Sequence, residues 1–205
     1  HDLAPFKIDQ DFISSARFRK RGLRKLLREV QKVDKIIAIS EATKRDIVEL
    51  LHVSSHKVQV IYLAAEANYH PQSEGEINRV REKYNLPRDY FIFVGSISGR
   101  KNTKNLVEAY HLSESLKKLD LVLIGNIAYR GQETVDEIKR RDLEEKVKFL
   151  DFVQDADLPA LYSGARGLTF PTFYEGFGMP VLEAMACGTP VLCGNKGACP
   201  EICGS

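Results

Sequence analysis

The chain has 205 residues, of which 43% are hydrophobic and 28% are charged. This composition is typical of a globular protein and excludes a wholly disordered, collagen-like or coiled-coil chain. Thirty Lys and Arg residues against 28 Asp and Glu residues leave a formal net charge of +2, which gives no general argument for binding nucleic acid. Because the length exceeds about 100–200 residues, we expect one domain and part of another.

No stretch of the sequence approaches the roughly 20 apolar residues that a membrane crossing needs. The N-terminus lacks the pattern of a signal peptide and does not begin with Met, so we expect a cytoplasmic protein of which this chain is a processed or excised piece. Its four cysteines gather near the C-terminus, at Cys187, Cys193, Cys199 and Cys203. We expect reduced structural thiols rather than zinc ligands or disulfides.

The segment 17–35 is predicted to be a basic amphipathic helix, because leucines and valines recur at steps of three and four among nine Lys and Arg residues. Two interpretations stay open for it. The helix could contact an anionic membrane surface that carries a lipid-linked acceptor, or it could be a solvated helix whose apolar face packs inward. Nucleic acid is not expected as a partner, because no aromatic residues are interleaved with the basic ones.

Buried-type strands and helices alternate along the rest of the chain. Strands are predicted near 35–40, 58–62, 90–95, 119–124, 147–152, 167–170 and 190–193, and helices near 40–51, 104–116, 133–141, 158–163 and 180–186. This alternation indicates an α/β fold with a Rossmann-like parallel sheet. We expect residues 1–68 to be the end of a first domain, 64–73 to cross between domains, and 69–205 to form a second domain without a closing helix.

The most informative segment runs from 170 to 186, where a predicted strand ends and a helix follows. Gly176 and Gly178 allow a ligand to approach the main chain, and Pro180 suits the start of a helix. The N–H groups of the first helical turn can bind an anion. Glu175 and Glu183 flank this loop, and each carboxylate can accept two hydrogen bonds from a diol. Alone, either glutamate could be a solvated loop residue or a helix-terminus residue; together they predict a site for a nucleotide sugar.

A second loop follows the predicted strand 90–95. Gly95 opens it, and the adjacent cations Arg100 and Lys101 could neutralise a diphosphate in the same crevice. Weaker signals come from Gly125, where a nucleoside could lie against the backbone, and from Val153, at the end of the next strand. Taken alone, basic residues in a loop are usually solvated, and Val153 could equally be a core residue.

These residues resemble a known family. The run from Glu175 through Gly176, Phe177 and Gly178 to Glu183 is similar to the Glu-x7-Glu signature of retaining GT-B glycosyltransferases of family 4. The loop from 94 to 102 resembles that family's diphosphate loop, with Ser96 where many relatives carry Arg. The segments 37–41 and 58–62, and the pair His1-Asp2, resemble parts of its N-terminal domain, whose glycine-rich loop is absent here.

The resemblance implies a role for each of these residues. Glu175 would hold the transferred sugar, Glu183 would hold the ribose, and Lys101 with Arg100 would hold the diphosphate. Main-chain groups of Phe177, Gly178 and Met179 would contact sugar and phosphate, Val153 would contact the base, and His1 would lie near sugar and acceptor. The implied reaction transfers a hexose, with retention, from a nucleoside diphosphate sugar to a hydroxyl of a glycan or glycolipid.

Two other functions remain open, a non-catalytic fragment that only binds a nucleotide sugar and a sugar-nucleotide epimerase on the same scaffold. No metal site and no cofactor besides the donor substrate are expected, because the remaining histidines lack metal-ligand spacing; these are His52, His56, His70 and His111. We expect the protein to lie in the cytoplasm, where it could be peripheral to the inner face of the membrane.

Overall fold

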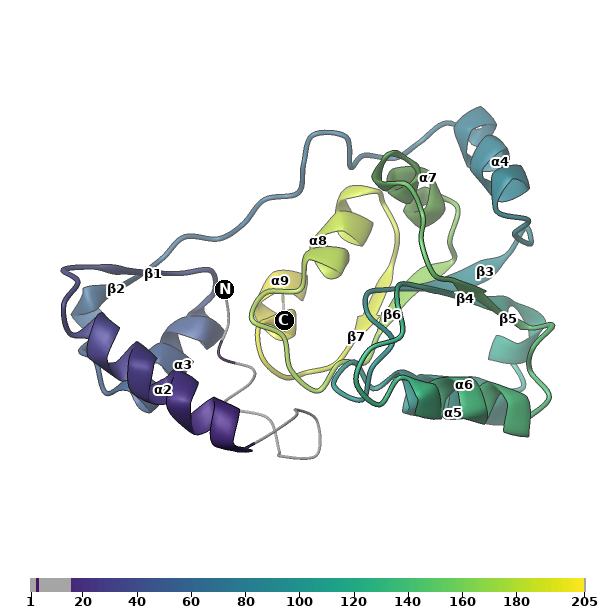
Figure 1. Ribbon diagram of the computed structural model, residues 1–205. Coiled ribbons are helices and arrows are strands. Elements are labelled where there is room, and N and C mark those ends of the chain that lie inside the picture. The colour runs from purple at the N-terminus through teal and green to yellow at the C-terminus, as the bar shows by residue number, and fades with distance from the viewer. Residues whose placement is uncertain (1–2, 4–15, 205) are drawn as a thin grey trace.

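The computed structural model describes residues 3 and 16–204 and arranges them as two lobes joined by a linker (Figure 1). The first lobe contains α2 (Ala16–Val30), β1 (Ile36–Ala38), α3 (Glu41–Leu51), the 3₁₀ helix η2 (Ser55–Lys57) and β2 (Val58–Val60). Strands β1 and β2 pair in parallel, with Ile36 opposite Val58. The parallel pair requires a crossover, which α3 supplies.

The apolar face of α2 packs into the first lobe. Leu26, Leu27 and Val30 lie in a core with Ala38 and Leu51, so the apolar side chains described on this helix are not free to enter a membrane. This observation favours the inward-facing interpretation of the predicted basic helix, which ends at Val30 rather than at 35. None of the helices in the described part of the chain combines the length and apolar character that a membrane crossing requires.

The second lobe is built around a five-stranded parallel sheet in the order β5-β4-β3-β6-β7. Its strands are β3 (Tyr90–Val94), β4 (Asp120–Ile124), β5 (Val147–Leu150), β6 (Gly167–Phe170) and β7 (Val191–Cys193), and its helices are α4 (Glu74–Lys83), α5 (Thr103–Leu112), η3 (Leu116–Lys118), α6 (Gln132–Arg140), η4 (Asp155–Asp157), α7 (Leu158–Ser163), α8 (Met179–Ala186) and α9 (Cys199–Cys203). Helices α5 and α6 cover one face, and α7 and α8 cover the other (Figure 1). Because both faces are covered, the central strands are continuous apolar runs.

Three details differ from the sequence-based expectation. Helix α4 was not predicted, and the expected helix 104–116 divides into α5 and η3. The expectation that no helix follows the last strand is wrong, because α9 packs against β7 and α8. The α/β class, the parallel sheet and its five strands are confirmed.

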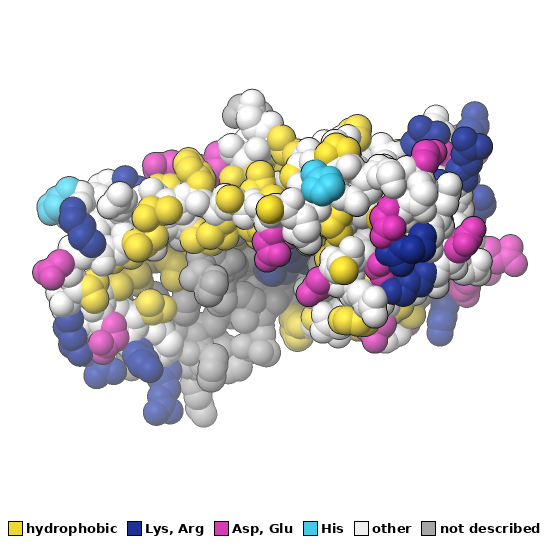
Figure 2. All heavy atoms as spheres, turned by 90° about the horizontal axis from the view of Figure 1, so that it is seen from above, with side chains coloured by type: hydrophobic (Ala, Val, Ile, Leu, Met, Phe, Trp, Pro, Cys, Tyr) yellow, Lys and Arg dark blue, Asp and Glu magenta, His cyan; other side chains and the backbone are white. Residues whose placement is uncertain are grey.

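The linker between the lobes carries exposed apolar side chains. Ile61, Tyr62 and Leu63 are each about half exposed, and Figure 2, which views the molecule from the linker side, shows apolar side chains along this region. The Tyr62 ring contacts the Phe177 ring of the second lobe, with a centroid distance of 6.4 Å. The linker therefore touches the loop that precedes α8.

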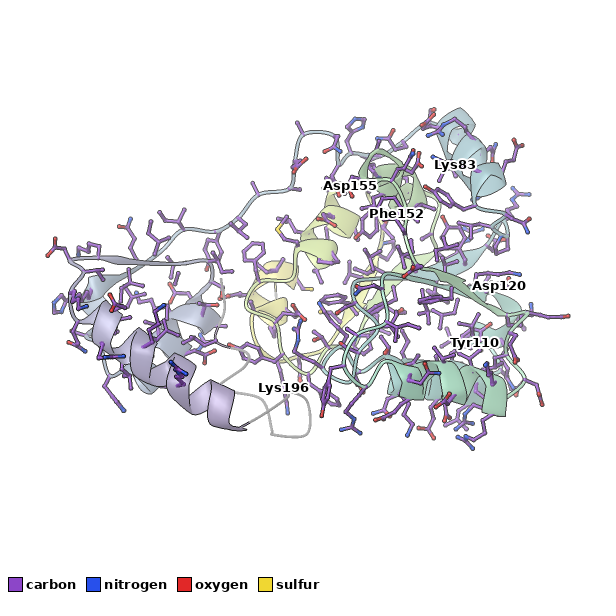
Figure 3. All side chains as sticks on the ribbon, in the orientation of Figure 1. Lys83, Tyr110, Asp120, Phe152, Asp155 and Lys196 are labelled. Carbon is purple, nitrogen blue, oxygen red and sulfur yellow. The ribbon has the colours of Figure 1, made fainter. Side chains whose placement is uncertain are left out.

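Asp157 ties α4 to the sheet domain. Burial opposes ionisation of its side chain, but hydrogen bonds from Lys83, Arg79 and Tyr84 outweigh that effect and lower its pKa to about 2. The Lys83 ammonium lies 2.6 Å and the Arg79 guanidinium 2.7 Å from the carboxylate, and Figure 3 shows Lys83 on α4 at the outer edge of the lobe.

We expect Asp157→Asn to lower the free energy of unfolding by about 1–2 kcal/mol at pH 7, because the lowered pKa stabilises the folded state only when the carboxylate is ionised. The difference in free energy of unfolding between the variant and the unsubstituted chain should narrow as the pH falls below about 4, the ordinary pKa of Asp. Urea unfolding at several pH values measures this. Asp155→Asn, at an exposed position on η4, is the control, and an equal loss in both variants would contradict the assignment.

Candidate functional site

The strand order places two loops side by side. Strands β4 and β5 lie on one side of β3, and the chain then returns to place β6 and β7 on its other side. The strand order therefore reverses at β3, and ligands of α/β sheets bind at the carboxyl ends of the strands at such a point. The loop 95–102 follows β3 and the loop 171–178 follows β6. They are joined directly by a hydrogen bond from the Phe173 amide to the Arg100 carbonyl, at 3.1 Å.

Glycines set the shape of the loops after β3 and β4. Gly95 and Gly125 have φ angles of 138° and 136°, a region that L side chains rarely adopt. A Cβ on Gly125 would lie 2.2 Å from the carbonyl oxygen of Gly95. These loops can therefore approach each other only with glycine at position 125.

Glu175 stands in a cluster of opposite charges. Its Oε1 accepts from the Arg100 guanidinium at 2.7 Å, lies 2.8 Å from the Lys101 ammonium, and accepts from the Thr172 hydroxyl at 2.9 Å. Only 8% of Glu175 is exposed. The structure thus brings together three of the predicted site residues, which come from the two neighbouring loops, and adds Thr172.

Lys101 is as deeply buried as Glu175, with 7% of its surface exposed. Burial lowers the pKa of its ammonium, and the charge of Glu175 opposes that shift. The ammonium also lies 4.6 Å from the centre of the Phe170 ring, a cation–π arrangement that favours the charged form. Gly95, whose positive φ favours glycine, packs against this side chain, and a Cβ there would lie 3.6 Å from the lysine's end, an ordinary contact distance.

The backbone of Glu175 is held from the opposite side by the segment before α9. The Ala198 amide donates to the Glu175 carbonyl oxygen at 3.0 Å. At Gly197, where φ is +63°, a Cβ would lie 2.4 Å from that same oxygen. The position of Glu175 therefore depends on glycine at 197, a residue that the sequence analysis did not single out.

Glu183 lies in a different environment, on α8. The Tyr162 hydroxyl donates to its Oε2 at 2.9 Å. Burial raises the pKa of Glu183, the tyrosine hydrogen bond opposes the shift, and the nearby negative charges of Glu66 and Asp155 add to it. Figure 3 shows Phe152 and Asp155 on the segment between β5 and α7, near α8, whereas Tyr110 and Asp120 lie at the far end of the sheet.

The loop between the two glutamates leads directly into α8. Gly178 is the N-cap with a φ of 105°, and it makes no side-chain capping hydrogen bond to the first turn. The helix begins at Met179, with Pro180 as its second residue rather than its first. Phe177 is buried against Tyr62 of the linker.

The remaining predicted site residues lie in three settings. Val153 is buried in the core of the second lobe, so only its main chain could meet a ligand, whereas its neighbour Phe152 is 77% exposed. Gly125 packs on the loop after β3. His1 lies outside the described residues.

The described residues show neither a metal-binding cluster nor a disulfide. Among residues 3 and 16–204, no group of three or more His, Cys, Asp or Glu side chains could hold a metal ion. The triplet Asp155-Ala156-Asp157 has the spacing of an Asp-x-Asp motif, but Asp157 is paired with Arg79 and Lys83. The four cysteines are free thiols, and burial raises the pKa of Cys187 to about 11 and of Cys199 to about 12.

Comparison with known proteins places this geometry in context. The family model described as "Glycosyl transferases group 1" matches residues 75–205. The O-antigen chain mannosyltransferase B of Escherichia coli is 34% identical over 91% of this chain and 50% of its own length, and the O-antigen chain mannosyltransferase RfbU of Salmonella typhimurium is 30% identical over 94% and 50%. The chain therefore spans about half the length of these curated relatives.

Solved structures agree on the fold. The crystal structure of Anabaena Alr3699/HepE in complex with UDP has a TM-score of 0.77 and 25% sequence identity to this chain. The match covers 93% of this chain and 53% of the HepE chain. WaaG, a glycosyltransferase involved in lipopolysaccharide biosynthesis, has a TM-score of 0.71 and 21% identity, covering 83% and 47%. These neighbours confirm the predicted GT-B architecture, of which this chain contains a partial Rossmann-like C-terminal domain.

We expect Gly197→Ala to cost more than about 2 kcal/mol of stability, because a positive φ alone costs about 1–2 kcal/mol and the Cβ also clashes with Glu175. Gly188→Ala is the matched control: its φ is +76°, and a Cβ there meets its nearest atom at 3.6 Å. Thermal unfolding of both variants measures the difference. Equal losses would contradict the inferred dependence of Glu175 on Gly197.

Proposed function

The chain belongs to the glycosyl transferases group 1 family, and we propose that it supplies the donor site of an enzyme that transfers a hexose from a nucleoside diphosphate sugar to a hydroxyl acceptor. The proposal depends most on one observation, the meeting of Glu175 with Arg100 and Lys101 at the carboxyl ends of β3 and β6. The N-terminus of α8 and the second acid, Glu183, follow Glu175 on the same continuous segment.

The charge of the cluster supports diphosphate binding. Two cations share one carboxylate, so these three groups carry a net charge of +1 in a largely buried setting, where charges interact more strongly than in water. The leaving group of the proposed reaction is a nucleoside diphosphate, which gains negative charge as the sugar departs. Cations already held in place stabilise that charge without reorganising.

The different surroundings of the two acids support different tasks. Glu175 is fixed by cations and Thr172, and we assign it to the hydroxyls of the transferred sugar. Glu183 accepts a hydrogen bond from Tyr162, and a carboxylate has further capacity to accept bonds from a ribose diol. Main-chain groups from Phe177 to Met179 would contact sugar and phosphate, and the main chain near Gly125 and Val153 would contact the nucleoside.

The proposed mechanism follows family 4, with retention of the anomeric configuration. The acceptor hydroxyl attacks the anomeric carbon on the face from which the diphosphate leaves. The bond from the anomeric carbon to the phosphate oxygen breaks, and the departing phosphate takes the acceptor proton. No metal ion is invoked, since Arg100 and Lys101 supply the positive charge.

The relatives guide the choice of substrates. The two curated relatives are named as O-antigen chain mannosyltransferases, which supports a hexose donor and a glycan or lipid-linked acceptor here. The complex of the HepE structure with UDP supports a nucleotide in the donor site. Exposed basic residues of α2, such as Lys25 and Arg28, would suit contact with an anionic membrane surface at the cytoplasmic side.

A nucleoside diphosphate should stabilise the chain, because a ligand that binds only the folded state raises the melting temperature. At about 100 times its dissociation constant the shift should be about 5–10 °C. Thermal unfolding with UDP, GDP and ADP at millimolar concentration measures this and identifies the base, with the nucleoside monophosphates as controls for the diphosphate. The absence of a shift with all three would refute the proposed site.

Substitution of the two acids should separate their tasks. Glu183→Gln should weaken nucleoside diphosphate binding about tenfold or more, because it removes a charged acceptor of ribose hydroxyls. Glu175→Gln should leave that affinity nearly unchanged and lower turnover about a hundredfold. Calorimetry with the nucleotide and an assay of donor transfer or hydrolysis measure the two effects, and the reverse order would contradict the assignments. A binding protein without catalysis would show no turnover in the unsubstituted chain.

A further inference from the structure

A polar face of α3, in the first lobe, contacts the loop that carries Glu175. The face consists of Ser40, Thr43 and Asp46, spaced three residues apart, which places them on one side of a helix. All three are buried, with 0%, 3% and 4% of their surface exposed. Polar residues are seldom buried so completely without partners, and each of the three has a partner in the other lobe.

Two of the three residues converge on one carbonyl. The hydroxyl of Ser40 donates to the Gly176 carbonyl oxygen at 2.5 Å, and the hydroxyl of Thr43 donates to the same oxygen at 3.0 Å. Ser40 is also the N-cap of α3, accepting from the Thr43 amide. Both lone pairs of the Gly176 carbonyl are thereby used by the first lobe.

The third residue reaches the other side of Glu175. The Tyr174 hydroxyl donates a hydrogen bond to the Asp46 carboxylate. A weaker contact joins the Ala42 amide to Glu201 of α9 at 3.4 Å. In Figure 1, α9 and the start of α8 lie on the side of the second lobe that faces the first. The first lobe therefore forms hydrogen bonds with the residues immediately before and after Glu175.

We propose that Ser40, Thr43 and Asp46 are positioning residues that hold the Glu175 loop in its sugar-binding conformation. Their contacts described above reach the Gly176 carbonyl and the Tyr174 hydroxyl, so they act through the residues on either side of Glu175. The proposal rests on the proposed function, because it takes Glu175 to bind the sugar. Its consequence is that the affinity for the sugar part of the donor depends on the two lobes being in contact.

Two conservative variants test this. Thr43→Val keeps the side-chain shape but removes a donor to Gly176, and Tyr174→Phe removes the hydroxyl bound to Asp46. Thr43→Ser, which keeps the hydroxyl, and Arg45→Ala, at an exposed position of α3, are the controls. Ser40 is left unchanged, since its loss would also uncap the helix.

The first readout is amide hydrogen exchange of residues 172–178, which requires no ligand. We expect exchange to accelerate about threefold to tenfold in Thr43→Val and Tyr174→Phe, and to stay unchanged in both controls. The second readout is the ratio of affinities for a nucleotide sugar and its nucleoside diphosphate, for example UDP-glucose and UDP, measured by calorimetry. The ratio should fall about threefold to tenfold in the same two variants, with the affinity for the diphosphate unchanged.

Unchanged exchange of the loop, or an unchanged affinity ratio where the nucleotide binds, would overturn the proposal. An equal loss in Thr43→Ser would also overturn it, because the hydroxyl would not be responsible. If the unsubstituted chain bound no nucleotide at all, the proposed function would fail instead. Hydrogen exchange would then decide whether α3 holds the loop.

Discussion

The rest of the site depends on the ion-pair cluster of Glu175 with Arg100 and Lys101. Lys101 is buried beside the Phe170 ring, where an unpaired ammonium would be costly. Glu175 offsets that cost, and the Thr172 hydroxyl occupies a further acceptor position on the same oxygen. Each loop therefore needs the other in order to bury its own charge. The loops after β3 and β6 form one structure, although 75 residues separate Arg100 from Glu175.

The same cluster explains why the surrounding backbone is so constrained. Gly95 provides the positive φ with which the Lys101 loop begins, and Gly197 allows the segment before α9 to reach the carbonyl of Glu175. Glu183 lies outside this network, held by Tyr162 and surrounded by further acids rather than by cations. Two glutamates eight positions apart thus differ in charge environment. Such a difference suits one acid that is locked in place and a second that still has hydrogen-bonding capacity for a ligand.

Sequence reasoning predicted the fold where periodicity is strong. The apolar strands β3 and β4 and the glycine-rich turns after them indicate a parallel sheet, and the Ser40 cap of α3 follows from local chemistry. Helix α4 carried a capping signature, Ser73 with Glu76 three residues later, but its few apolar residues gave a weak pattern. The pairing of Glu175 with Arg100 requires the strand order, which local sequence does not contain. Likewise Tyr162, Thr172 and Gly197 acquire their importance only through contacts distant along the chain.

The contact between α3 and the Glu175 loop links the two halves of the molecule physically. The hydroxyl and carboxylate groups on α3 that are buried between the lobes would become hydrated if the lobes separated, and so would the Gly176 carbonyl. Because these groups can be fully hydrated in water, separation loses little net hydrogen-bond energy, whereas the Glu175 loop loses its support on one side. Separation of the lobes would therefore cost little in hydrogen bonding and would remove one support of the Glu175 loop. A donor site that is completed by contact with the first lobe would bind the sugar most tightly when both lobes are in place.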